Sequence, residues 1–202
     1  MKLYYFPGAC SLAVHIVLRE AGQAFDLDKL DLATGTTAAG EDYRQVNAKG
    51  YVPALRLDDG EVLTEAAVIL QYLADLKPDS GLAPPAGGMA RYRLMEWLNF
   101  VATEIHKTLG ALFNPKASPD WKADRIALFG RRAGWLEDQL ADRPFLMGAA
   151  FSVADAYLFT VLRWCGLFQI DLGPWPRLRG YMALIAERPS VQAAMKAEGL
   201  AG

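Results

Sequence analysis

The chain has 202 residues, of which 52% are hydrophobic, and its 21 lysine and arginine residues nearly balance 23 aspartate and glutamate residues. This balance excludes a field that would attract nucleic acid or an anionic membrane, and no stretch is long and apolar enough to span a bilayer. Two cysteines, Cys10 and Cys165, two histidines far apart in the sequence and no recognisable secretion signal predict a cytoplasmic protein without a structural metal.

The first third of the chain alternates short strand patterns with short helical ones. Strands are predicted over residues 2–5 and 25–30, and a hairpin over 54–57 and 61–63. Helices are predicted over 11–21, more weakly over 41–46, and over 65–75. The resulting order βαβαββα fits a small sheet with helices packed on it.

Residues 78–88 are rich in proline and glycine, a composition that continues neither helix nor strand, and they are predicted to link two domains. Beyond them the hydrophobic period is helical, with helices expected over 89–112, 121–140, 153–165, 175–187 and 190–197. The predicted fold class is therefore an α/β domain of residues 1–77 followed by an all-α domain of residues 89–202.

Cys10 lies between the first strand pattern and the first helix. Unpaired backbone N–H groups and the positive end of the helix dipole favour its thiolate there. The residue three places on is Ala13 rather than a second thiol, so a disulfide of Cys10 needs another partner, such as a small-molecule thiol. The alternative is an inert core cysteine, because free cysteines are commonly buried.

Two further groups of polar residues have two interpretations each. Thr64 and Glu65 open a predicted helix, either as a simple N-cap with a residue that complements the dipole, or as a ligand site. Asn99, Thr103 and His106 fall at i, i+4 and i+7 on one helix face. That stripe suits a hydrogen-bond network between helices or the wall of an active cleft.

Four segments together resemble the glutathione S-transferases, and among these the bacterial beta class that carries a cysteine. They are Cys10-Ser11-Leu12-Ala13, Tyr51-Val52-Pro53-Ala54-Leu55, Leu63-Thr64-Glu65-Ala66-Ala67 and His106-Lys107. Each is weak alone, but their order and spacing are specific, and the match covers essentially the whole chain. The resemblance implies a thioredoxin-like domain followed by a C-terminal helical bundle, in agreement with the predicted elements.

The resemblance also implies a site for glutathione as co-substrate. In it the Val52-Pro53 bond is cis rather than the commoner trans, and the backbone of Val52 pairs with the cysteinyl residue of glutathione between Tyr51 and Pro53. Glu65 takes the γ-glutamyl ammonium, and the backbone N–H of Ala66 takes the neighbouring α-carboxylate.

The helical domain is implied to form the opposite wall of this site. Asn99 and His106 are expected near the glutathione sulfur, with Thr103 on the same stripe, and Lys107 adds positive potential. Glu104 is implied to reach glutathione bound to the partner subunit.

Two positions depart from the family pattern. Ala66 stands where serine is usual, which removes a hydroxyl contact of about 1–2 kcal/mol. Gly35 stands where beta-class relatives commonly place a lysine that pairs with the glycine carboxylate of glutathione, which leaves backbone N–H groups and threonine hydroxyls to substitute for it. Glutathione binding is therefore predicted to be weaker than in the lysine-bearing relatives.

The predicted function is that of a homodimeric glutathione transferase, whose bound glutathione thiolate attacks a small hydrophobic electrophile. Cys10 then either donates a hydrogen bond to the sulfur or forms a mixed disulfide with it. The electrophile is expected near Phe113-Asn114-Pro115, Trp164 and Phe168. Two alternatives stay open: a glutathione-dependent thiol-disulfide oxidoreductase that acts through Cys10, and a non-catalytic binding protein.

Overall fold

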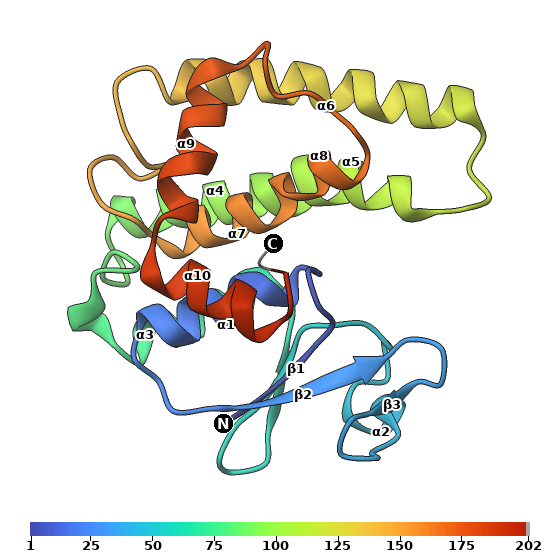
Figure 1. The fold of residues 1–202 in the computed structure, drawn as a ribbon. Helices are drawn as coiled ribbons and strands as arrows, with labels where there is room; N and C mark the ends of the chain where they lie inside the picture. Colours follow the sequence, from blue (N-terminus) through green and yellow to red (C-terminus); the bar gives the residue numbers. More distant parts are fainter. Residues whose placement is uncertain (201–202) are drawn as a thin grey trace.

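The computed structural model describes residues 1–200, and its sheet and its helical part form two layers, one above the other in Figure 1. The sheet has the order β3-β2-β1-β4-β5, in which β1 runs parallel to β2 and the other neighbours are antiparallel. Its strands are β1 (Lys2–Tyr5), β2 (Asp26–Asp31), β3 (Thr36–Thr37), β4 (Ala54–Arg56) and β5 (Val62–Thr64).

The helices follow the predicted division. The sheet part contains α1 (Ser11–Glu20), α2 (Tyr43–Val46) and α3 (Ala66–Asp75), followed by the short 3-10 helix η1 (Pro78–Ser80). The helical part contains α4 (Met89–Phe100), the π-helix η2 (Val101–His106), α5 (Lys107–Gly110), the 3-10 helix η3 (Ala111–Phe113), α6 (Pro119–Gln139), α7 (Val153–Leu162), α8 (Trp164–Leu167), α9 (Pro176–Ala186) and α10 (Pro189–Ala197). Within residues 1–200, no helix is both long and apolar enough to cross a membrane.

The structure differs from the predicted elements in two respects. β3 was not predicted, because a two-residue strand in a run of threonine and glycine carries no alternating pattern; it forms where Thr37 pairs with Leu30 of β2. The helix expected over 89–112 is interrupted by η2, and the helix expected over 153–165 breaks at Arg163, before α8.

The alternation of side chains along β1 divides the sheet part into two cores. Leu3 and Tyr5 belong to the large core that contains residues of α1 and α3, and Tyr4, on the opposite face, packs with Tyr43 of α2. The large core also includes the apolar residues of α7, from Val153 to Leu162. The two parts of the chain therefore share one continuous apolar interior.

The first and last helices of the chain lie side by side, as Figure 1 shows for α1 and α10. His15 of α1 is fully buried, and its Nδ1 lies 2.8 Å from Oε1 of Glu198, directly after α10. The other carboxylate oxygen of Glu198 accepts a hydrogen bond of 2.9 Å from the backbone N–H of Gly8. Arg19 completes the network by donating from Nε to Nε2 of His15, at 2.9 Å.

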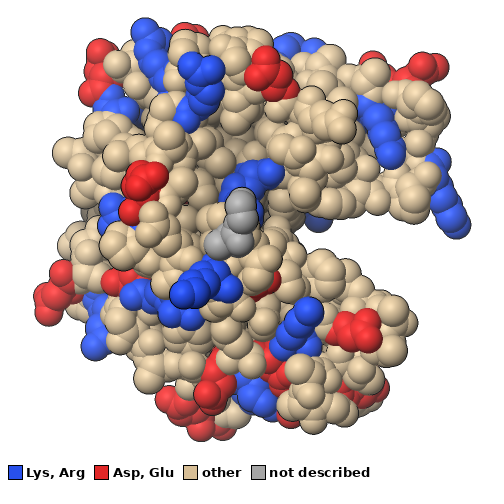
Figure 2. All heavy atoms as spheres, viewed as in Figure 1, with Lys and Arg blue, Asp and Glu red and all other residues tan. Residues whose placement is uncertain are grey.

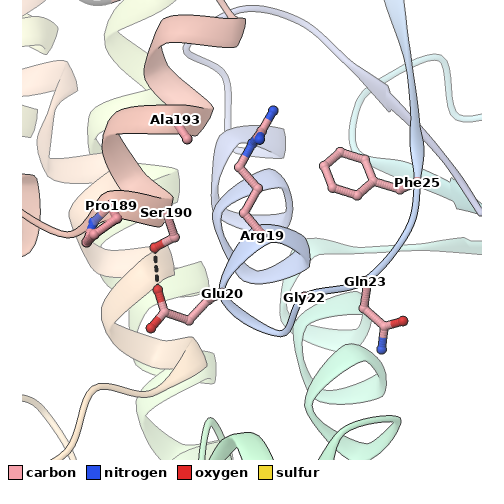
Figure 3. A pocket seen from close by; sticks show the side chains of 8 residues that line it. All are labelled: Arg19, Glu20, Gly22, Gln23, Phe25, Pro189, Ser190 and Ala193. Carbon is pink, nitrogen blue, oxygen red and sulfur yellow. Dashed lines mark hydrogen bonds between the residues drawn. The ribbon is translucent and has the colours of Figure 1, made fainter.

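A hollow lies at the outer end of the same junction, between the end of α1 and the start of α10 (Figure 3). Glu20 accepts hydrogen bonds there from the Ser190 hydroxyl and from Arg188, so it joins the two helices across the hollow. The guanidinium of Arg19 lies 5.7 Å from the centre of the Phe25 ring on the other side. The contacts of Glu20 at this hollow hold α10 against α1.

Replacing Glu198 by Ala tests this junction. The substitution leaves the buried N–H of Gly8 and the ring of His15 without their acceptor, so we expect the free energy of unfolding to fall by about 2–5 kcal/mol in urea denaturation followed by tryptophan fluorescence. Glu187→Ala is the matched control, because Glu187 is exposed directly after α9, and it should change stability by less than about 0.5 kcal/mol. Equal stability of the two variants would contradict this account.

Candidate active site

A cavity of about 680 Å³ lies between the sheet part and the helical part. Figure 2 shows the surface hollowed between these two parts of the molecule. The sheet part contributes two loops and the start of α3, with Phe6 to Cys10, Gly50 to Pro53, Glu65 and Ala66. The helical part contributes Ala102, His106, Lys107, Gly110, Phe113, Tyr157, Arg163, Trp164 and Leu167. Most of the residues singled out in the sequence therefore lie around one space.

Cys10 is the N-cap residue of α1, as predicted, but it is not poised as a thiolate. Its side chain is buried, and its Sγ donates a hydrogen bond of 3.3 Å to the carbonyl oxygen of Val52. Burial raises the pKa of the Cys10 thiol to about 12, although the N–H groups of the helix start and the charge of Lys107 act in the opposite direction. The N–H groups at the helix start do favour the thiolate, as predicted, but desolvation outweighs them, so the thiol keeps its proton in this structure.

The peptide bond Val52-Pro53 is cis, which confirms the prediction. The loop before it is held from behind, since the carbonyl oxygen of Tyr51 accepts hydrogen bonds from the Tyr43 hydroxyl (3.0 Å) and from Nδ2 of Asn47 (2.7 Å). The backbone N–H of Val52 has no hydrogen-bond partner among residues 1–200. This group therefore stands at the cavity ready to pair with the backbone of a bound peptide.

Glu65 occupies the N-cap position of α3 with a backbone φ of 72°, a conformation that side-chain-bearing residues rarely adopt. Neither Thr64 nor Glu65 caps the helix with its side chain, so the simple capping interpretation is wrong. The Glu65 carboxylate instead accepts hydrogen bonds from Lys49 and, at 3.0 Å, from the Tyr51 hydroxyl. The hydrogen bond from Lys49 is the main reason why the pKa of Glu65 is lowered.

The start of α3 is therefore an anion site beside a carboxylate. The N–H groups of its first turn lack a side-chain acceptor, and Ala66, the first helical residue, lines the cavity. An amino acid with a free ammonium and a free carboxylate matches this pair of charges, since Glu65 attracts the ammonium and the helix start attracts the carboxylate.

His106 faces the cavity from η2 as a neutral imidazole. Burial, together with the charge of Lys107, lowers its pKa to about 4. Its Nδ1 lies 2.6 Å from the hydroxyl of Tyr157, whose own pKa is raised by burial, so the phenol keeps its proton. With the Tyr157 hydroxyl as the donor to Nδ1, the ring proton of His106 lies on Nε2. His106 thus offers a neutral N–H donor.

The predicted stripe of Asn99, Thr103 and His106 does not form one wall. Asn99 and Thr103 are exposed, and the Thr103 hydroxyl donates to the Asn99 carbonyl oxygen at 3.0 Å. His106 instead lines the cavity together with Ala102, and both lie in the π-helix η2. In the single chain, neither Asn99 nor Thr103 lines the cavity.

Glu104 and Lys107 lie in different places relative to the cavity. Glu104 is bound to Arg132 of α6, with 2.7 Å between the carboxylate and the guanidinium, and it lies outside the cavity lining. Lys107 is exposed at the cavity rim, and its charge acts on Cys10, Glu65 and His106.

Two residues of the site, Tyr157 and Lys49, were missed in the sequence, and Trp164 has a contact that was not expected. Tyr157 orients His106 from an apolar helix in which its hydroxyl carries no pattern. Trp164, expected only as part of the electrophile pocket, donates from Nε1 to the carbonyl oxygen of Gly8 at 2.8 Å and so holds the loop before Cys10. Lys49 binds Glu65 from a loop that the sequence presents as a simple turn.

Comparison with known proteins agrees with this geometry. Residues 8–76 match the family model "Glutathione S-transferase, N-terminal domain", and residues 119–184 match "Glutathione S-transferase, C-terminal domain". Glutathione S-transferase GstA of Escherichia coli O157:H7 is 46% identical over 200 residues, which cover 99% of this chain and 100% of that protein. The chain belongs to the glutathione S-transferase family. It is a glutathione transferase, as the sequence predicted.

Two solved structures are similar over their whole length. A sphingomonad glutathione S-transferase complexed with glutathione is 50% identical, covers 100% of both chains and superposes with a TM-score of 0.96. A bacterial beta-class glutathione S-transferase of Sphingomonas chungbukensis is 49% identical, with the same coverage and a TM-score of 0.96. These likenesses confirm the predicted beta class and the predicted fold of a thioredoxin-like domain followed by a helical domain.

The protonation state of Cys10 is testable by alkylation. In a Cys165→Ala variant without glutathione, iodoacetamide should modify Cys10 at pH 7 at least about a hundredfold more slowly than free cysteine, because a pKa of about 12 leaves almost no thiolate. The rate should keep rising with pH up to pH 10. The same variant unfolded in urea is the control and should react at the ordinary rate, whereas a rate plateau below pH 8 in the folded protein would contradict the account.

The state of His106 is testable by its own titration. The carbon-bound proton between the two ring nitrogens gives an NMR signal that can be assigned by its loss in a His106→Asn variant. Its chemical shift should change with pH with a midpoint near pH 4. Because the histidine of the unfolded chain titrates near pH 6.5, the folded protein should lose stability as pH falls from about 6.5 to about 4. A midpoint near 6.5 would show that His106 is not held neutral.

Proposed function

We propose that this protein binds glutathione along the edge formed by Glu65, Ala66 and Val52, and transfers it to an apolar electrophile that lies against the helical domain. The charges at the start of α3 suit the γ-glutamyl end, since Glu65 offers a carboxylate and the Ala66 N–H opens a helix without a side-chain cap. The backbone of Val52, between Tyr51 and Pro53, suits the cysteinyl residue.

The observation that carries the proposal is the set of neutral donors beside the expected place of the sulfur. A thiol with a pKa near 8.5 is only about 3% ionised at pH 7, whereas a pKa near 6.5 makes about three quarters available, and this shift requires about 2.7 kcal/mol of preference for the thiolate. The neutral Cys10 thiol, the Nε2–H of His106, and the charge of Lys107 together favour that thiolate.

The protonation state of Cys10 argues against the alternative function, a glutathione-dependent thiol-disulfide oxidoreductase. A thiol-disulfide exchange that starts from Cys10 needs its thiolate, and burial raises the pKa of that thiol to about 12. Cys10 in our proposal therefore donates its proton in a hydrogen bond to the glutathione sulfur, in place of the Val52 carbonyl oxygen.

The electrophile is proposed to pack on an aromatic cluster of the helical domain. The Phe113 ring lies 5.3 Å from the ring of Trp164 and 4.7 Å from that of Phe168, and Leu167 is 67% exposed beside them. This wall supports a division of labour in which residues 1–77 hold glutathione, residues 78–88 connect the domains and residues 89–202 provide the electrophile site.

The weak point of the proposed glutathione site is its glycine end. Gly35 has a φ of 72° and open space around its Cα, so no side chain reaches the glycine carboxylate from this position. A Gly35→Lys substitution would add the missing charge but force a side-chain-bearing residue into a strained backbone, at a cost of about 1–2 kcal/mol. Threonine hydroxyls and backbone N–H groups of the neighbouring turn are proposed to substitute.

A homodimer in the cytoplasm is also proposed. Exposed apolar side chains gather on α4, where Met89, Tyr92 and Met95 are 70%, 57% and 43% exposed, and Trp135 on α6 is 42% exposed. Such a surface favours association with a second copy, which would place Asn99, Thr103 and Glu104 near the partner's site. Two reduced, buried cysteines suit a reducing compartment.

The proposal is tested by titrating bound glutathione. In a Cys10→Ala, Cys165→Ala double variant, the thiolate absorbance near 240 nm reports only the ligand, and we expect its pKa to lie about one unit or more below that of free glutathione, because His106 and Lys107 remain. A His106→Asn change in the same background should return the pKa towards the free value. Binding with an unshifted pKa in both proteins would contradict thiolate activation by the cavity.

A further inference from the structure

Arg163 lies at the junction of α7 and α8 and lines the cavity. Its side chain makes no hydrogen bond or ion pair with any of residues 1–200, which sets it apart from Arg19, Arg91, Arg132 and Arg188. Burial lowers the pKa of Arg163, yet an arginine stays charged at neutral pH. The cavity therefore contains a partly buried cation with hydrogen-bond donors to spare.

The helical part of the cavity lining around Arg163 is largely apolar. It includes Phe113, Trp164 and Leu167, and Leu200 also lines the cavity. Glu65 is the carboxylate of the lining, and it is already bound by Lys49 and Tyr51. Glu198 attracts Arg163 through space, but its two oxygens are taken by His15 and Gly8.

The two cations of the cavity have different environments. Lys107 is exposed at the rim, where water and salt screen its charge, and it faces the proposed place of the glutathione sulfur. Arg163 is only partly exposed, directly precedes Trp164 in the chain, and lines the same cavity as the aromatic residues proposed for the electrophile. An arginine in such a place binds a carboxylate with two parallel hydrogen bonds, and a mostly apolar pocket uses one such group to orient its ligand.

We propose that the electrophile of this enzyme carries a carboxylate on an aromatic body, and that Arg163 binds this carboxylate and so determines specificity. The inference rests on the proposed function of the cavity. For a chloronitrobenzoate, the glutathione thiolate forms a C–S bond to the ring carbon that bears chlorine, the electron pair passes into the ring and nitro group, and the C–Cl bond then breaks to release chloride. No oxidant, reductant or further reactant is needed.

The test compares two electrophiles that differ only in charge, 4-chloro-3-nitrobenzoate and 4-chloro-3-nitrobenzamide. For each, kcat/KM is divided by the rate constant of the uncatalysed reaction with glutathione, which removes the difference in intrinsic reactivity. The wild-type enzyme should favour the carboxylate in this normalised ratio. Arg163→Met should lower the ratio about ten- to hundredfold, since a hydrogen-bonded charge pair is lost.

Two further variants separate charge binding from other effects. Arg163→Lys keeps the charge but loses the two parallel hydrogen bonds, so it should retain only part of the preference and lie between wild type and Arg163→Met. Arg131→Met removes one charge from an exposed position on α6, outside the cavity lining, and should leave the ratio unchanged. A normalised ratio that is the same in wild type and Arg163→Met, or a wild type that favours the amide, would overturn the inference.

The absence of turnover with both electrophiles would count against the proposed transfer reaction and not against the role of Arg163. Calorimetric binding of 3-nitrobenzoate and 3-nitrobenzamide to the wild-type protein loaded with S-methylglutathione then decides the question. Tighter binding of the carboxylate that weakens with added salt and is lost in Arg163→Met supports the inference. Equal binding of the two compounds overturns it.

Discussion

The site depends on one residue, Gly8, whose backbone N–H and C=O are both held by the helical domain. Its N–H donates to Glu198 after α10, and its carbonyl oxygen accepts from Nε1 of Trp164 in α8. Its φ of +73° is one that glycine adopts without strain, and a Cβ there would lie 3.4 Å from Leu200. The loop that precedes Cys10 is therefore held from the helical domain as well as by its own hydrogen bonds, such as that from the Ala9 N–H to the Phe6 carbonyl oxygen.

This dependence explains why a protein built from two structural parts has one continuous core. If the helical domain moved away, the Gly8 N–H and the ring of His15 would both lose their buried acceptor, and a hydrogen bond to the Gly8 carbonyl would be lost with Trp164. The hydrogen bonds that join the two domains therefore also hold the loop before Cys10. His15, which the sequence places in an apolar helix without any chemical pattern, acts entirely through this contact.

The sequence was a good guide wherever local chemistry decides the structure. Periodicity and turn residues predicted the helices and the β4–β5 hairpin, and the resemblance of Tyr51 to Leu55 to its family implied the cis bond before Pro53. It failed where long-range packing decides. The pKa of Cys10 depends on the depth to which two domains bury it, and His106 lies in a π-helical turn that the helical period of residues 89–112 did not predict. The contact between Tyr157 and His106 was not predicted either, because the two residues are far apart in the sequence.

The two halves of the site recognise their ligands by different means, and this difference bears on the two departures from the family pattern. In the proposed binding mode, glutathione meets mostly backbone groups and helix ends, whose positions are fixed by the fold of the sheet domain, so the absence of a lysine at position 35 and of a serine at position 66 would remove strength without removing the binding mode. The opposite wall consists of side chains on α5, α7 and α8, which change by single substitutions without disturbing the sheet. In the proposed mechanism, an arginine on that wall would change the choice of electrophile, while the chemistry proposed for Cys10, His106 and Lys107 at the sulfur would stay the same.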